Sequence, residues 1–241
     1  GKGSYTDFIA ISFSSTDYVG HKMGPQSVEL EDTYLRLDRD IAEIITALEK
    51  SYGKDGFLLF LTADHAAAYV PSQLMDLKMN AGYFSSKVFS DSLKKYLVKT
   101  YNDTSLVSKI INDQVYLNHS LIKQKNINLK GLAEDIVSLA LTFKGVANAY
   151  TSDQLNGVAL KNNSAALIQN GFYIKRSGDV AILLEPQWLD DYSHTGTSHG
   201  TTYSYDTHVP LLWYGWDIKP GNTSAPIDIT DIAPTIAALL N

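Results

Sequence analysis

The stretch GFLLFLTADH, residues 56–65, ends a nearly continuous apolar run with an aspartate and a histidine. Consecutive apolar residues predict a strand that is buried on both faces, as in a parallel sheet covered by helices. In sheets of this kind the functional side chains lie at the carboxyl ends of the strands. We therefore expect Asp64 and His65 to lie at a sheet edge where a site can form.

The segment before this strand predicts another strand and a helix. Residues 7–15 alternate between apolar and polar positions, which predicts a strand with one buried face. Between residues 28 and 50 the apolar side chains recur at three- and four-residue steps. Glu29 and Glu31 lie in the expected first turn and Gly53 follows the expected end, so this segment predicts a long amphipathic helix. Strand, helix and strand in this order are typical of an α/β fold.

The composition changes in the middle of the chain, which suggests an insertion. Residues 80–155 contain short strand and helix patterns that predict a small inserted α+β subdomain. Residues 1–79 and 156–241 are then expected to form one α/β core, whose main sheet resumes with strands at 178–188 and 208–218. The last apolar segment, ITDIAPTIAALLN, predicts a closing helix.

Composition and charge exclude several classes of function. The 241-residue chain has a formal net charge of −6, which argues against binding to duplex nucleic acid. It has no cysteine, so disulfides and thiolate metal ligands are excluded, and it has no apolar run long enough to predict a membrane span. The chain starts without Met and opens at once on a predicted strand, which suggests a piece of a longer protein.

Acidic residues and histidines occur together at three predicted strand exits or loops. SFSSTDYVGHKMG (12–24) and TADH (62–65) each carry an acid and an imidazole, and TSHGTTYSYDTH (197–208) adds another histidine. The five candidate metal ligands are Asp17, His21, Asp64, His65 and His199. Taken singly, each is better explained as a turn, capping or loop residue than as a metal ligand. Together they favour a metal site, because zinc binds imidazole nitrogen and carboxylate oxygen. His208 is expected to hydrogen-bond Asp206 or the backbone.

Five ordered motifs give the chain a family resemblance: SSTDYVGHKMGP, DTYLRLDRDI, FLTADHAAA, SHGTTYSYDTHVPLLWYG and DITDIAPTIAALL. The chain resembles the alkaline phosphatase superfamily, in the branch of the nucleotide pyrophosphatase/phosphodiesterase-like enzymes and the phosphate-irrepressible alkaline phosphatases. The resemblance implies an α/β fold with a mostly parallel sheet flanked by helices.

The resemblance also implies a site and a reaction. The family has two zinc ions, and by position Asp17, His21 and His199 would hold one ion while Asp64 and His65 would contribute to the other. Its usual Asp-His-Gly motif is changed here, because Ala66 follows His65. The implied activity is hydrolysis of phosphoric esters of small molecules, through a two-metal site and a phosphorylated Thr or Ser.

The same resemblance places the nucleophile and one further Asp ligand in an N-terminal half that this chain lacks. We therefore expect the chain alone to be inactive. A periplasmic or extracellular location is implied by the resemblance only.

Other functions remain open at this point. Within the superfamily the chain could belong to a sulfatase, a phosphoglycerate mutase or a phosphoethanolamine transferase. It could also be a non-catalytic binding module with a vestigial metal site, and zinc content would distinguish this module from an enzyme. The motifs leave the choice between monoester and diester substrates open, as well as the oligomeric state.

Overall fold

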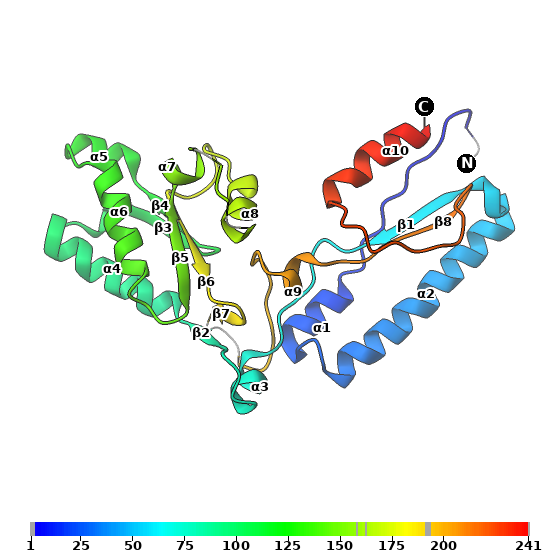
Figure 1. Cartoon of the computed structure of the whole chain (residues 1–241), viewed down its shortest axis with the longest axis horizontal. Coiled ribbons are helices and arrows are strands. Elements are labelled where there is room, and N and C mark those ends of the chain that lie inside the picture. Colours follow the sequence, from blue (N-terminus) through cyan, green and yellow to red (C-terminus); the bar gives the residue numbers. More distant parts are fainter. Residues whose placement is uncertain (1–2, 158, 162, 191–193, 241) are drawn as a thin grey trace.

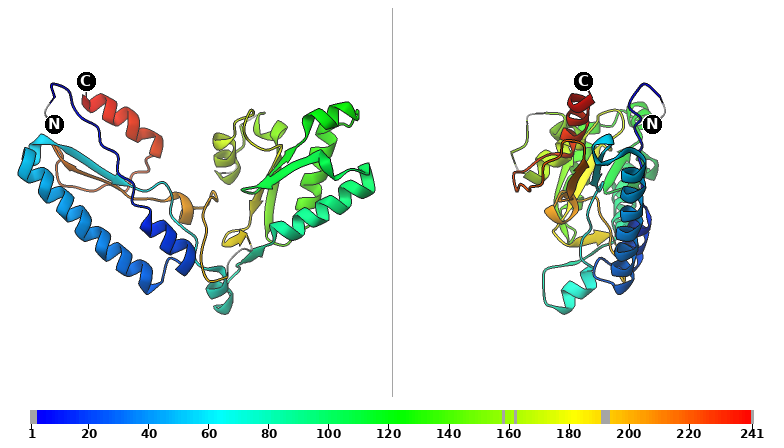
Figure 2. Two further views of the ribbon diagram at one scale, coloured as in Figure 1. Left: turned by 180° about the vertical axis from the view of Figure 1, so that it is seen from behind. Right: turned by 90° about the vertical axis from the view of Figure 1, so that its right-hand side faces the viewer.

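A computed structural model describes residues 3–157, 159–161, 163–190 and 194–240. The described chain forms two lobes, which Figure 1 and the left view of Figure 2 show side by side. We call the described residues of 3–70 and 194–240 the terminal lobe, and those of 80–190 the inserted lobe. The short helix α3 (Pro71–Asp76) lies where the chain passes from one lobe to the other. Helices and sheets occur in both lobes, which confirms the α/β class.

The terminal lobe contains four helices and one pair of strands among its described residues. These elements are α1 (Ser15–Met23), α2 (Val28–Tyr52), β1 (Leu58–Thr62), α9 (Ser204–Thr207), β8 (Leu211–Gly215) and α10 (Ile232–Leu240). Two 3-10 turns, Lys54–Gly56 and Ile229–Asp231, precede β1 and α10.

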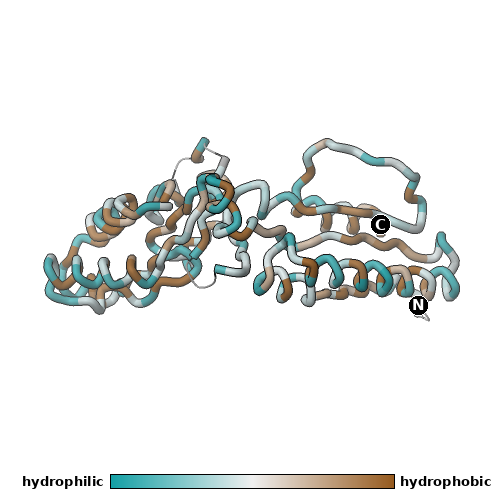
Figure 3. The backbone as a smooth tube through the Cα atoms, turned by 90° about the horizontal axis from the view of Figure 1, so that it is seen from below, coloured by the Kyte–Doolittle hydropathy of each residue, from teal (hydrophilic) through white to brown (hydrophobic). Residues whose placement is uncertain are grey.

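Helix α2 confirms the predicted amphipathic helix. The hydroxyl of Ser27 caps its start by accepting the Leu30 N–H at 3.2 Å, and the chain leaves the helix at Gly53. Figure 3 shows hydrophobic and hydrophilic residues alternating along its turns. Near its end, Glu49 accepts a hydrogen bond from the Tyr214 hydroxyl on β8, so the helix is tied to the strand pair.

The strand predicted from GFLLFLTADH is β1, but its direction relative to its neighbour differs from the expectation. β1 pairs with β8 in antiparallel register, from Leu58 opposite Gly215 to Thr62 opposite Leu211. An apolar run reports burial and carries no information on which way the neighbouring strand runs. The long connection between the two strands leaves either direction open. Among the described strand pairs, the β2–β7 pair alone is parallel.

The strand predicted for residues 7–15 is wrong. Residues 6–14 form no regular element, and Ser15 already begins α1. Phe8 and Ile9 are 65% and 77% exposed, and no described strand is hydrogen-bonded to this segment. The polar residues that were interpreted as a strand exit instead start a helix, with Asp17 in its first turn, where the helix dipole favours an acid.

The inserted lobe is built on a four-stranded sheet with the order β3-β4-β6-β5. Its elements are β2 (Gly82–Phe84), α4 (Ser86–Tyr101), β3 (Val107–Ile111), β4 (Gln114–Leu117), α5 (His119–Gln124), α6 (Leu129–Ala140), β5 (Val146–Thr151), α7 (Ser152–Leu155), α8 (Asn163–Gly171), β6 (Val180–Leu184) and β7 (Trp188–Asp190), with a 3-10 turn at Thr104–Leu106. Asn112 and Asp113, both with positive φ, close the hairpin between β3 and β4.

The strand at 178–188 was expected in the main sheet, and this expectation is wrong. β6 pairs in antiparallel fashion with β4 and β5, and all five of its residues are buried. An apolar strand can bury its side chains in any sheet that is covered on both faces. Its sequence therefore does not determine which of the two sheets it joins. α8, β6 and β7 follow residue 155 yet lie in the inserted lobe, so the lobes divide the chain differently from the predicted domains.

Buried apolar side chains are concentrated in the inserted lobe. The main cluster joins α4, α6 and the inner strands, with Phe89, Leu97, Leu132 and Val180 fully buried. In the terminal lobe β1 is half-buried throughout and α10 has no buried residue. The lobe that carries the predicted site therefore has the smaller core.

Candidate metal centre

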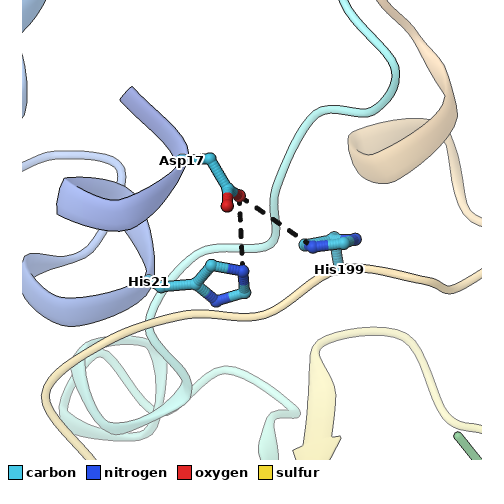
Figure 4. A group of neighbouring side chains, drawn as sticks. All are labelled: Asp17, His21 and His199. Atoms are coloured by element: carbon cyan, nitrogen blue, oxygen red, sulfur yellow. Dashed lines mark ion pairs between the residues drawn. The ribbon is translucent and has the colours of Figure 1, made fainter. Parts of the chain in front are cut away.

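Helix α1 supplies the first two candidate ligands. Asp17 and His21 are four residues apart, so the helix places both side chains on one face. The Nε2 atom of His21 lies 3.3 Å from Oδ1 of Asp17. Figure 4 shows the two side chains pointing toward one another from the helix. The pairing predicted from the sequence is present, although it is on a helix and not at a strand exit.

The loop before α9 fixes the orientation of the His21 ring. Its Nδ1 atom lies 2.9 Å from the carbonyl oxygen of Thr197, and the Thr197 N–H donates to the His21 carbonyl at 3.2 Å. A carbonyl only accepts, so Nδ1 carries the proton and Nε2 presents a lone pair toward Asp17. Thr197 is buried, and its hydroxyl donates to the Ala68 carbonyl, which connects this loop to the chain after β1.

The same loop delivers His199 from the other side of Asp17. Its Nε2 atom lies 4.0 Å from Asp17 Oδ1, and its ring centroid lies 5.1 Å from that of His21. Burial lowers the pKa of His199, and the neighbouring His65 and His21 lower it further, against the opposing effect of Asp17. The imidazole is thus held in its neutral, metal-binding form at neutral pH.

His65 joins this group, and Asp64 lies at its exposed edge, with its Oδ1 atom 3.8 Å from His65 Nε2. The His65 ring lies against that of His199, and its Nε2 atom is 3.6 Å from Asp17 Oδ1. Asp64 is 91% exposed, and its carboxylate accepts the His65 N–H at 3.1 Å. Ala66, where the family motif has glycine, is not among the described residues with positive φ, so its methyl group causes no backbone strain.

Asp17, His21 and His199, which we call the acid–imidazole cluster, have ligand atoms that all lie within 4.8 Å of one another. Donor atoms at about 2.0–2.1 Å around a tetrahedral ion are separated by roughly 3.3 Å. The 3.3 and 4.0 Å separations from Asp17 are close to that spacing. One oxygen and two nitrogens also suit zinc in chemistry, so the residues fit a small divalent ion.

Asp206 is a buried residue near the site for which the sequence suggested a different partner. Of the two partners expected for His208, the structure has the backbone one, because the His208 N–H donates to the Ser204 carbonyl at 2.9 Å, and no bond joins His208 to Asp206 among the described residues. Asp206 instead accepts from Thr201 through Oδ2, and its carbonyl accepts the Ala66 N–H. Burial raises the pKa of the Asp206 carboxyl, while Thr201 opposes the rise. Thr197 and Asp206 were missed as site residues, because a buried threonine or aspartate has no periodic signature.

Two other histidines lie outside the cluster. His194 is exposed and stacks on Tyr83 with ring centroids 4.2 Å apart. His119 is exposed in the inserted lobe, as expected, and its Nε2 atom lies 2.6 Å from Asp179 Oδ1. Neither residue lies near enough to the acid–imidazole cluster to belong to it.

Comparison with known proteins places the chain in a family. A model described as type I phosphodiesterase / nucleotide pyrophosphatase matches residues 4–209. A protein named calcium-transporting ATPase from Myroides odoratus is 40% identical over 236 residues, which cover 98% of this chain and 43% of that protein. Alkaline phosphatase PhoV from Synechococcus elongatus is 40% identical over 241 residues, which cover 100% of this chain and 43% of PhoV.

A solved structure agrees with these matches. The crystal structure of alkaline phosphatase PafA superposes with a TM-score of 0.88 at 36% identity, over 94% of this chain and 43% of that chain. The chain thus spans less than half of the length of the relatives it matches. None of the described helices is both long and apolar enough to cross a membrane. The resemblance to the alkaline phosphatase superfamily is confirmed, and the chain belongs to the type I phosphodiesterase / nucleotide pyrophosphatase family.

Proposed function

We propose that this chain is part of a zinc-dependent phosphoric ester hydrolase, an alkaline phosphatase or a phosphodiesterase. The observation that carries the proposal is the acid–imidazole cluster, in which a carboxylate and two imidazoles from distant segments converge. The similarity of the chain to alkaline phosphatases PhoV and PafA supports the reaction class. The donor set supports zinc over calcium, because imidazole is a softer ligand than oxygen.

In this proposal the five candidate residues divide between two ions. Asp17, His21 and His199 hold the first ion. Asp64 and His65 contribute to the second, which receives its remaining ligands from outside this chain. In support, the Nε2 atom of His65 lies 3.6 Å from Oδ1 of Asp17, so the ligands proposed for the two ions are neighbours. When bound, such a pair of ions supplies charge stabilisation for an in-line displacement at phosphorus.

The residues of this chain then serve to bind and orient. The hydrogen bond between His21 and Thr197 fixes the tautomer that leaves Nε2 available. The lowered pKa of His199 keeps its ring neutral at the pH where the site works. We propose that the attacking Thr or Ser hydroxyl lies outside this chain, so that the chain binds zinc without turning over a substrate.

Zinc binding tests the site directly. Isothermal titration of the 241-residue chain with zinc is expected to show binding that His21→Ala abolishes and His194→Ala leaves unchanged, since His194 lies outside the cluster. Wild-type binding that survived His21→Ala would refute the proposed ligand set.

Hydrolysis tests the reaction. A protein of the full length of the relatives, loaded with zinc, is expected to hydrolyse phosphate monoesters or diesters faster than a sulfate ester. The chain alone, with zinc added, is expected to stay at the background rate with an aryl phosphate. Turnover by the chain at the rate of the longer protein would contradict a nucleophile outside it. We further propose a periplasmic or extracellular location, which fractionation of the source cells would check.

A further inference from the structure

We infer that Asp206 is a positioning residue that holds His65 and His199 against one another. Asp206 lies on α9 and is 3% exposed, and it is the one buried acidic side chain among the described residues. A buried carboxylate is costly unless its surroundings compensate for it. Its partners belong to the two segments that carry these imidazoles.

One connection runs to the segment of His65. The N–H of Ala66, the residue directly after His65, donates to the Asp206 carbonyl at 2.8 Å. This bond is made by the backbone of both residues, so it fixes the path of the chain just beyond the His65 ring. The position of α9 therefore sets the position of His65.

The second connection runs to the segment of His199. Oδ2 of Asp206 accepts two hydrogen bonds from Thr201, at 2.8 Å from its N–H and 2.7 Å from its hydroxyl. Between Thr201 and His199 lies Gly200 with φ of 108°, a backbone conformation that suits glycine alone. The turn after His199 is thus anchored two residues away on the same aspartate.

Both connections meet where the two rings stack. The centroids of His65 and His199 are 3.3 Å apart and their planes differ by 10°. The second carboxylate oxygen, Oδ1, is buried and has no hydrogen-bond partner among the described residues. Asp206 thus contacts the His199 segment through Oδ2 and the His65 segment through its backbone carbonyl. His21 is held separately by Thr197. This separation makes the role of Asp206 testable.

Two readouts follow the positioning role, and the first needs no metal. Asp206→Ala removes the acceptor of both Thr201 hydrogen bonds and leaves the backbone bond to Ala66 in place. In a metal-free NMR spectrum of this variant the ring signals of His199 are expected to shift, and those of His65 with them because the two rings stack, while those of His21 shift least. The second is the zinc affinity of the chain, which is expected to fall roughly 10- to 100-fold, as for other residues that orient ligands. This second readout rests on the proposed function, and the first does not.

Matched variants separate positioning from general damage. Thr201→Val, which lacks the hydroxyl donor but keeps its N–H, is expected to shift the same signals as Asp206→Ala by a smaller amount, and Thr201→Ser is expected to behave as wild type. In the double variant the two losses should not add, because both remove one contact. Asp179→Asn is the control: Asp179 accepts the Leu117 N–H at 2.7 Å in the inserted lobe, and its replacement is expected to leave all three site rings unchanged.

The proposal is overturned if Asp206→Ala and Thr201→Val leave the His65 and His199 signals unchanged. It is also overturned if His21 shifts as much as the other two rings. If the wild-type chain binds no zinc, the proposed metal site is refuted. The role of Asp206 is still decided by the metal-free spectra.

Discussion

His65 lies face to face with His199, with the ring centroids 3.3 Å apart and the planes 10° from parallel. Two imidazoles tolerate this contact when they are neutral, because two positive charges so close together would repel. The contact brings the segment after β1 and the loop before α9 to one place, although 134 positions separate the two residues in sequence (199 − 65).

Loss of a ligand from the acid–imidazole cluster is expected to weaken zinc binding more than loss of a supporting residue. His199→Ala removes one of three donors, so the affinity should fall by more than the roughly 10- to 100-fold typical of supporting residues. Isothermal titration of both chains measures the difference. His119→Ala is the control, because His119 pairs with Asp179 in the other lobe. Equal affinities for the His199→Ala variant and the wild type would exclude His199 as a ligand.

Gly196→Ala is expected to disturb His21 without unfolding the inserted lobe. A Cβ atom at position 196 would lie 1.8 Å from the His21 carbonyl oxygen, so the loop must move away from α1. The movement breaks the contacts between Thr197 and His21 that fix the ring. Zinc affinity should therefore fall, which titration measures, while Gly221→Ala, with open space at its Cβ, should have no effect. Unchanged affinity in Gly196→Ala would show that the loop does not position His21.

Asp113 is expected to make stability depend on pH. Burial raises its pKa from 3.8 to about 6, and the charge of Asp190 adds to the rise. Between these two values the folded chain holds more protons than the unfolded chain. The contribution of Asp113 to the free energy of unfolding therefore falls as the pH rises from 3.8 to about 6, and this contribution is constant above that range.

Asp113→Asn tests this dependence by removing the titrating group. We expect the slope in that window to flatten and stability at pH 7 to rise by up to about 3 kcal/mol, since the shift from 3.8 to about 6 spans about two pKa units and each unit is worth about 1.4 kcal/mol. Urea unfolding from pH 3.5 to pH 7 measures both effects. Asparagine suits the positive φ at this position, so the gain at one pH is weaker support than the lost slope. A slope that persists in the variant would exclude Asp113 as its source.

The two lobes are expected to differ in local stability. All residues of β6 are buried, whereas β1 is half-buried and belongs to a two-stranded sheet, a type that is marginal without further packing. Hydrogen exchange followed by mass spectrometry should show faster exchange of the backbone amides in β1 and β8 than in β5 and β6. Equal protection of the two sheets would contradict the difference in burial.

Some of this structure follows from local sequence rules. Helix α2 is predictable because its periodicity, its acidic first turn and Gly53 all indicate one element. Asp17 and His21 were recognised as a pair because their spacing is short. His65 and His199 are predictable as candidate ligands because each lies with other polar residues at a predicted strand exit or loop, but only the resemblance of ordered motifs assigns them to two different ions.

Other features depend on contacts that local sequence does not encode. The direction of β8 and the sheet joined by β6 depend on which segments meet across long connections. Residues 7–15 have a strand-like pattern, but a strand also needs a hydrogen-bonded partner, and none of the described strands pairs with them. Asp206 acts through hydrogen bonds to Ala66 and Thr201, so its role appears only when both loops are in place.

The β1–β8 pair has a practical consequence for work with this chain. Each strand has one neighbour among the described residues, so its outer edge offers unpaired N–H and C=O groups, and Leu212 beside them is 58% exposed. Such edges act as templates that recruit strands from other molecules. The purified chain is therefore expected to aggregate when it is concentrated. Leu212→Lys is expected to delay the onset of light scattering.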